Sequence, residues 1–214
     1  MPGPIRFHFD LLSPYAYIAW TQIGALAERH GRAVQPVPIL LAALLNEYGH
    51  KGPAEIPPKR RYVYADCLRT CRVLGLPLAP PPSHPFNPLL GLRVASVPMA
   101  DDARDAVITG LFEAVWAGGG GVETPEAVGA IVARAGLDPV ATLTAAVSPE
   151  GKQRVKDQTA QAMADGVFGV PTMTVDGALF WGYDSFAHLD RHLAGDGTDL
   201  SGLDRFEVPA SASR

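Results

Sequence analysis

The chain has 214 residues, 47% of them hydrophobic, and a formal net charge of −4 at pH 7. This length and apolar content suit one domain, or one domain with a large insertion, around a substantial core. No basic stripe indicates nucleic acid, no basic amphipathic segment indicates a membrane surface, and no apolar run reaches the ~18 residues of a membrane span. The amino terminus also lacks the pattern of an export signal, so we expect a cytoplasmic, reduced setting.

The first two elements of the chain form a strand followed by a helix. Ile5–Phe9 alternates as a short strand does, and the apolar spacing of Tyr15–His30 predicts a helix that ends at Gly31. Ser13 is the expected N-cap of this helix and Pro14 its first residue. A group at such a helix start lies among unpaired backbone N–H groups and the positive end of the helix dipole, which favour an anion such as a thiolate.

Ser13 has two interpretations. Thioredoxin-like redox proteins carry the first thiol of a C-x-x-C pair at a junction of this kind, but here Ser13 and Ala16 occupy the two thiol positions. No protein disulfide can form there, so any thiol must come from another molecule. The Ser-Pro pair is also an ordinary helix start, and the chain repeats the device at Thr124-Pro125 and Ser148-Pro149.

The middle of the chain is mostly helical. Val34–Ile39 reads as a second strand, which Pro36 and Pro38 confine to a sheet edge. From about Leu40 to Asp165 the periodicity is helical, interrupted by six prolines between positions 77 and 88. The expected helices are Lys59–Val73, Leu89–Val97, Asp102–Trp116, Pro125–Ala135, Pro139–Val147 and Pro149–Asp165, with N-caps at Asp101 or Asp102, Thr124, Asp138 and Ser148.

The cysteines and histidines do not indicate a metal or redox site. Cys67 and Cys71 lie four residues apart on an expected helix, which is the wrong spacing for a redox pair and lacks two further ligands for zinc. They read as small buried core residues. His188 and His192 share a helix face without a third ligand in view, so we expect no bound metal.

The end of the chain places a proline opposite Ser13. Val170–Pro171 opens a strand that Asp176-Gly177 turns back into a hairpin. In thioredoxin-like folds a proline here is cis and faces the helix that bears the reactive group, and its neighbouring peptide groups can pair with an extended ligand. A last helix, Ser185–Leu193, has Asp184 as its expected N-cap and offers a second helix start for a carboxylate. A site for a thiolate, peptide groups that can pair with an extended ligand, and a site for a carboxylate together describe a glutathione pocket.

Three blocks carry a family resemblance: Phe9–Tyr15, Gly49–Arg60, and Val167–Thr172 with Phe180–Asp184. In this order and spacing the chain resembles the 2-hydroxychromene-2-carboxylate isomerases and the related kappa-class glutathione transferases, in the DsbA-like branch of the thioredoxin fold. The resemblance implies an α/β fold in which a thioredoxin-like β/α layer carries a large all-helical insertion. The expected division is a thioredoxin-like domain of residues 1–39 and 166–195, a helical insertion domain of residues 40–165, and a C-terminal tail of residues 196–214.

The resemblance also implies glutathione as cofactor, with Ser13 as the catalytic residue that assists its sulfur. The implied glutathione contacts are Ser13, Tyr15, His50, Val170, Pro171, Tyr183 and Asp184, where His50 replaces an asparagine that is frequent in relatives. For the substrate we expect Lys59 to attract an acid, Phe86 to stack on an aromatic ring and Asn87 to orient a carboxylate or hydroxyl.

The implied activity is glutathione-dependent cis–trans isomerisation of an aromatic unsaturated oxo-acid during the degradation of aromatic compounds, by a homodimer. Three alternatives stay open: a kappa-like transferase that consumes glutathione, a disulfide oxidoreductase, which Ser13 and Ala16 disfavour, and a non-catalytic thioredoxin-like binding module.

Overall fold

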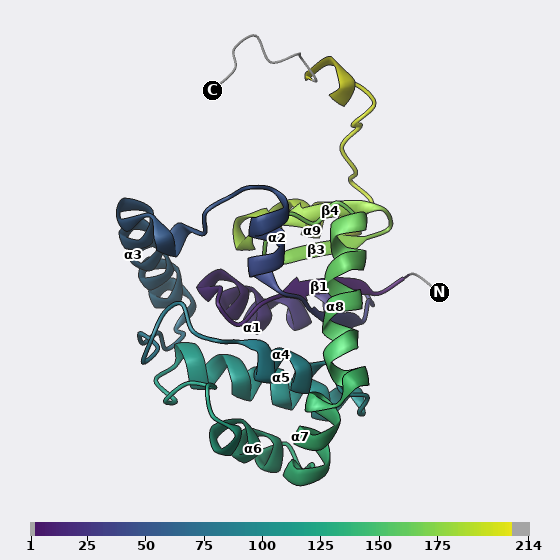
Figure 1. Cartoon of the computed structure of the whole chain (residues 1–214). Helices are drawn as coiled ribbons and strands as arrows, with labels where there is room; N and C mark the ends of the chain where they lie inside the picture. The colour runs from purple at the N-terminus through teal and green to yellow at the C-terminus, as the bar shows by residue number, and fades with distance from the viewer. Residues whose placement is uncertain (1–2, 207–214) are drawn as a thin grey trace.

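A four-stranded mixed sheet forms the centre of the computed structural model, which describes residues 3–206 (Figure 1). Its strands, β1 (Ile5–Phe9), β2 (Val34–Pro38), β3 (Thr172–Val175) and β4 (Ala178–Trp181), lie in the order β2-β1-β3-β4. β1 is parallel to β2 and antiparallel to β3, and β3 and β4 form the antiparallel hairpin expected around Asp176-Gly177. The four predicted strands are confirmed, and the proline-containing β2 lies at an edge.

Helices make up most of the rest of the described chain. They are α1 (Pro14–Arg29), α2 (Leu41–Glu47), α3 (Pro57–Leu74), α4 (Leu89–Ala95), α5 (Asp101–Trp116), α6 (Pro125–Arg134), α7 (Pro139–Val147), α8 (Pro149–Ala164) and α9 (Phe186–Leu193), with short 3-10 helices η1 (Pro53–Glu55), η2 (Tyr183–Ser185) and η3 (Leu203–Phe206). All six helices expected within residues 59–165 are present. None of the helices in residues 3–206 is both long enough and apolar enough to cross a membrane.

The predicted caps are mostly confirmed. Thr124, Asp138 and Ser148 each accept a hydrogen bond from a backbone N–H in the first turn of their helix. The expected cap of α5 is wrong, because that helix begins at Asp101 itself and its N-cap, Ala100, has no side-chain bond. An acidic residue in the first turn is stabilised by the helix dipole without capping.

The structure describes only part of the predicted C-terminal tail. Residues 196–206 include the short helix η3, and residues 207–214 of the expected tail lie outside the described part of the chain. The bounds of the expected domains, at residues 39/40 and 165/166, stay a prediction.

One face of β1 joins the sheet to the helical segment. Phe7 and Phe9 are fully buried, and both rings pack on Trp20 of α1, with centroid distances of 5.6 and 6.4 Å. Phe9 also packs on Phe112 of α5 at 5.5 Å. Helix α1 is therefore held by the same core that joins the sheet to α5, which fixes where the start of α1 lies.

The opposite face of the sheet contacts α8, the long helix that runs from α7 toward the sheet in Figure 1. Thr159, buried in α8, accepts a hydrogen bond from Leu40 N at the end of β2 (3.0 Å) and donates one to Val155 O (2.6 Å). His8 points away from Phe7 and Phe9 and shares a hydrogen bond with Thr174 Oγ1 (3.1 Å). Burial, aided by Arg6, lowers the pKa of His8 to about 4, so this histidine is neutral at physiological pH.

Thr159→Val should destabilise the fold, because it leaves the partly buried Leu40 N–H without its acceptor. We expect a loss of ~1–3 kcal/mol in the free energy of unfolding, measured by urea denaturation. Thr144→Val, at an exposed position of α7, is the matched control and should change stability by less than about 0.5 kcal/mol. Equal stabilities of the two variants would contradict a structural role for the Thr159–Leu40 bond.

Candidate functional site

The site predicted around Ser13 assembles at one end of the sheet. The Val170–Pro171 peptide bond is cis, as predicted, and lies next to the start of α1. Ser13 is only 7% exposed, and its Oγ lies 3.4 Å from Val170 O. Two segments about 157 positions apart in sequence thus meet at one hydroxyl.

The hydroxyl of Ser13 accepts one hydrogen bond and donates a second, longer one. Its oxygen accepts a hydrogen bond from Ala16 N (3.2 Å), which confirms Ser13 as the N-cap of α1. Its own proton points to Val170 O over 3.4 Å, near the upper limit for a hydrogen bond. Val170 precedes β3 and takes no part in its pairing with β1 or β4. The hydroxyl proton and the Val170 peptide are therefore available to an extended ligand.

Buried side chains fix the turn that carries Ser13. Asp10 Oδ1 accepts a hydrogen bond from Leu12 N (3.0 Å). Trp116 at the end of α5 donates from Nε1 to Leu11 O (2.9 Å), and His84, in the loop before α4, donates from Nε2 to Leu12 O (2.9 Å). Sequence reasoning missed Trp116 and Asp10. The available signal was chemical, because a buried indole or carboxyl needs a hydrogen-bond partner.

Asp10 also connects this turn to α2. It is fully buried, and its second oxygen accepts a hydrogen bond from Leu41 N (2.8 Å), the first residue of α2. Burial raises the pKa of Asp10 to about 6, although the backbone N–H groups around it favour the carboxylate. One side chain thus joins the start of α1 to the start of α2.

Tyr15, an expected glutathione contact, uses its hydroxyl within the protein. The hydroxyl donates to Asp66 Oδ2 on α3 (2.8 Å), and burial together with Asp66 raises the pKa of Tyr15. Tyr15 therefore ties α1 to α3, and only its ring and backbone remain for a ligand.

The two cysteines lie on α3 as buried free thiols, as expected. Burial raises the pKa of Cys67 to about 12 and also raises that of Cys71, so neither thiol is reactive at neutral pH. Within residues 3–206 no three His, Cys, Asp or Glu side chains gather as metal ligands would.

The segment after α2 lies against the segment before Val170. Tyr48, the residue after α2, donates from its hydroxyl to Val167 O (3.4 Å), and its ring centroid lies 6.5 Å from that of His50. His50 is exposed. Because Tyr48 contacts both His50 and Val167, His50 lies near the cis-proline loop. Lys59, in the first turn of α3, is exposed.

Tyr183 and Asp184 lie in η2, which packs against α1. Gly182, whose φ of 84° favours glycine, connects this turn to the cis-proline loop by donating from its N–H to Pro171 O (2.9 Å). The prediction that Asp184 caps the last helix is wrong. The chain enters α9 through an extra 3-10 turn, α9 begins at Phe186, and no side chain caps it. Asp184 is exposed within that turn.

The expected substrate loop lies beside the Ser13 turn through the bond from His84 to Leu12. Asn87 uses Oδ1 to accept a hydrogen bond from Leu89 N (3.1 Å) at the start of α4, and its amide nitrogen remains free to donate to a ligand. Phe86 is half-buried and packs edge-on to His84, with ring centroids 6.3 Å apart.

Comparison with known proteins identifies the family. Residues 4–194 match the family model of the DSBA-like thioredoxin domain. The 2-hydroxychromene-2-carboxylate isomerase of Pseudomonas putida is 30% identical over 190 residues, which cover 87% of this chain and 92% of the relative. The chain belongs to the 2-hydroxychromene-2-carboxylate isomerase family.

Two further comparisons agree with this membership. A solved structure of a 2-hydroxychromene-2-carboxylate isomerase matches with a TM-score of 0.82 and 26% identity, over 96% of this chain and 99% of that one. A kappa 2 glutathione S-transferase of Caenorhabditis elegans is 26% identical over 182 residues, 80% of each chain. The predicted DsbA-like fold with its helical insertion is confirmed, and the chain belongs among enzymes of isomerase type.

Asp10→Asn should change how stability depends on pH. Because the pKa of Asp10 is raised to about 6 in the folded protein, the folded state binds a proton more tightly than the unfolded state, whose carboxyl has a pKa near 3.8. On acidification from pH 7 to pH 4 the wild type should therefore gain about 2 kcal/mol of stability relative to Asp10→Asn, measured by urea denaturation at each pH. A stability difference that does not vary with pH would contradict a buried, titrating Asp10.

Proposed function

We propose that this chain is a glutathione-dependent cis–trans isomerase of an aromatic unsaturated oxo-acid, active as a homodimer in the cytoplasmic degradation of aromatic compounds. The observation that carries the proposal is the Ser13 hydroxyl, held at the start of α1 and directed at the peptide before cis-Pro171. The isomerases and kappa glutathione transferases among its relatives support it.

The residues present fit glutathione. Val170 has peptide groups outside the sheet, which can pair with the cysteinyl backbone of an extended tripeptide. Tyr183 and the exposed Asp184 would hold the γ-glutamyl end, where the Asp184 carboxylate can accept from the amino group. Pro171 would lie under the cysteinyl unit, and Tyr15 and His50 would complete the contacts.

Ser13 acts in this proposal as a hydrogen-bond donor to sulfur. Its hydroxyl and the positive end of α1 together lower a thiol pKa that is otherwise about 8.5. When bound, glutathione would supply the thiolate for reversible addition to the substrate double bond, and Ser13 with the start of α1 would hold its sulfur. Ser13 itself is no nucleophile, because its hydroxyl contacts only Ala16 N and Val170 O and neither is a base.

Three further side chains would serve the substrate. Lys59, exposed at the start of α3, would attract the acid group by its charge. The amide nitrogen of Asn87 would donate to a carboxylate or hydroxyl, since its oxygen is already bonded to Leu89 N. Phe86 would contact the aromatic ring.

The second candidate is a kappa-like transferase, which the similarity to a kappa 2 glutathione S-transferase favours. Both activities would use the same site, and product analysis separates them. An isomerase returns all of its glutathione, whereas a transferase converts it to a conjugate. A non-catalytic binding module would turn over neither kind of substrate.

Ser13→Ala tests the proposed activity. It removes a charge-assisted hydrogen bond of ~1.5–3 kcal/mol to the bound sulfur, so the thiol pKa should rise by roughly 1–2 units and the rate at neutral pH should fall about 10- to 100-fold. The pH titration of the thiolate absorbance of bound glutathione and the isomerisation rate are the two measurements.

Ser148→Ala is the matched control for Ser13→Ala, since Ser148 caps α8 in the same Ser-Pro arrangement. Each variant should lose ~1 kcal/mol of stability through its missing cap, but only Ser13→Ala should change the thiol pKa. Superimposable titration curves and equal rates for the wild type and Ser13→Ala would reduce Ser13 to a helix cap.

Asp184→Asn tests where the γ-glutamyl end lies. Loss of an exposed ion pair with the glutathione amino group should raise the dissociation constant about threefold to fivefold, measured by calorimetry. Asp157→Asn, at an exposed position of α8, should leave affinity unchanged. An unaltered affinity of Asp184→Asn would count against placing the γ-glutamyl end at η2.

A further inference from the structure

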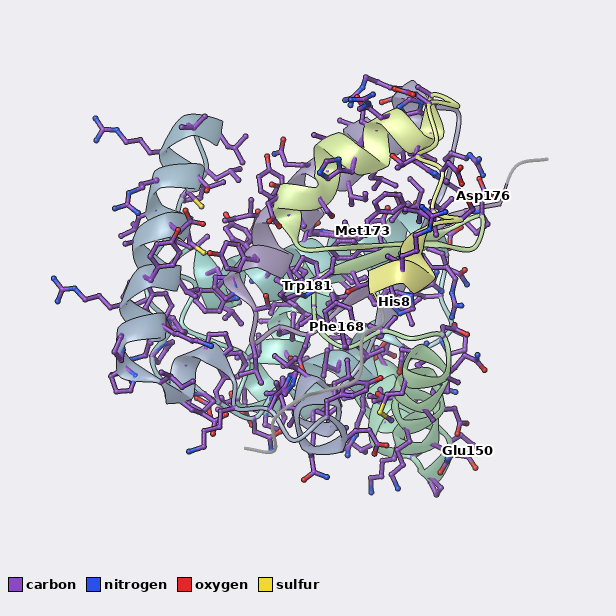
Figure 2. The ribbon with its side chains drawn as sticks, turned by 90° about the horizontal axis from the view of Figure 1, so that it is seen from above. His8, Glu150, Phe168, Met173, Asp176 and Trp181 are labelled. Carbon is purple, nitrogen blue, oxygen red and sulfur yellow. The ribbon has the colours of Figure 1, made fainter. Side chains whose placement is uncertain are left out.

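Two large aromatic side chains lie exposed beside the cis-proline loop. Phe168 is 40% and Trp181 53% exposed, and their ring centroids lie 5.1 Å apart with the planes tilted by 58°. Figure 2 labels the two residues next to one another. Neither has a role in the fold that would explain its exposure.

The pair lies at the same end of the sheet as Ser13. Trp181 is the last residue of β4 and pairs with Thr172, the residue after cis-Pro171. Phe168 precedes Val170, which contacts the Ser13 hydroxyl, by two residues. Both residues therefore lie at the end of the sheet where we place glutathione. Because Trp181 and His8 both pair with Thr172, the indole lies on the His8 face of the sheet, opposite α1.

The surrounding backbone holds the pair in place. Gly169 is buried, and a Cβ added to it would come within 2.7 Å of Trp181 Nε1, so the indole rests directly on the Gly169 backbone. Thr172 Oγ1 donates to Gly169 O (2.8 Å), which fixes the loop beneath the indole. The rings thus stand on a buried, hydrogen-bonded loop.

A third exposed aromatic side chain adjoins the pair. Tyr48 is 39% exposed and donates from its hydroxyl to Val167 O, next to Phe168. Among residues 3–205 the exposed large aromatic side chains are these three and Tyr62 on α3. Apolar surface that gathers beside a reactive site is typical of a ligand-binding surface, and aromatic rings gain most from a planar partner.

We propose that Phe168 and Trp181 form the platform on which the aromatic ring of the substrate stacks. This inference rests on the proposed function and names the part of the site that selects an aromatic acid. It adds a stacking surface to the ring contact proposed for Phe86, which is half-buried and packs on His84.

The test uses trans-cinnamate as a planar aromatic acid and crotonate as the same unsaturated acid without a ring. S-methylglutathione, which has no free thiol, takes the place of glutathione. Trp181→Ala and Phe168→Ala should each weaken cinnamate binding about tenfold, while Trp181→Phe, which keeps a ring, should lose far less. Crotonate should bind weakly and equally to all of them.

Two further variants separate the platform from general damage. Gly169→Ala must displace the Trp181 ring without removing it, so it should weaken cinnamate binding, and Tyr62→Ala should not. The affinity for S-methylglutathione should stay within about twofold throughout, since a stacking site for the substrate makes no contact that the tripeptide needs.

The outcomes of this test are distinct from those for the proposed function. If the wild type binds no glutathione, the proposed function fails, yet quenching of Trp181 fluorescence by cinnamate alone still tests the platform. Equal cinnamate affinity in Trp181→Ala and the wild type would overturn the platform. A changed oligomeric mass of Trp181→Ala with unchanged cinnamate affinity would also overturn the platform. Phe168 and Trp181 would then form an interface between two copies of the chain.

Discussion

The backbone turn from Asp10 to Ser13 is the constraint on which the rest of the site depends. Its buried N–H and C=O groups would each cost free energy if left unpaired, and side chains from distant parts of the chain satisfy them. The indole of Trp116 binds Leu11 O and the imidazole of His84 binds Leu12 O. Both come from the helical segment between the early and late strands. That segment therefore does more than cover the sheet, because it sets the position of the hydroxyl at the start of α1.

The electrostatics of the site favour an anion that the protein does not itself supply. Ser13 offers a weakly held proton, and α1 offers its positive end, but the only two cysteines of the chain are buried on α3 with raised pKa values. The protein therefore offers no reactive thiol for a redox reaction at this site. A thiol brought by a peptide-like ligand would meet the Ser13 hydroxyl, the start of α1 and the Val170 peptide at one place. At the position where a disulfide oxidoreductase of this fold presents a cysteine, this chain presents the Ser13 hydroxyl, which in the proposed function donates to an external sulfur.

Local signals in the sequence predicted the elements well, and contacts between distant segments could not be predicted in the same way. The Ser-Pro and Thr-Pro starts located α1, α6 and α8 because capping is decided within four residues. The cis peptide at Pro171 was predicted from the likeness to thioredoxin-like folds, in which the proline at the start of this strand is cis. The Trp116–Leu11 bond joins residues 105 positions apart, which no spacing rule predicts. Asp184 was misplaced because 3-10 turns are frequent at helix starts and the local sequence did not reveal the one before α9.

In the proposed function an extended peptide thiol lies between the start of α1 and the peptide before cis-Pro171. A crystal structure of the protein with glutathione is the decisive measurement. We expect a cysteinyl backbone paired with Val170 and a sulfur within about 3.5 Å of Ser13 Oγ. Glutathione ordered elsewhere, or bound at Val170 with its sulfur directed away from Ser13, would disprove this placement.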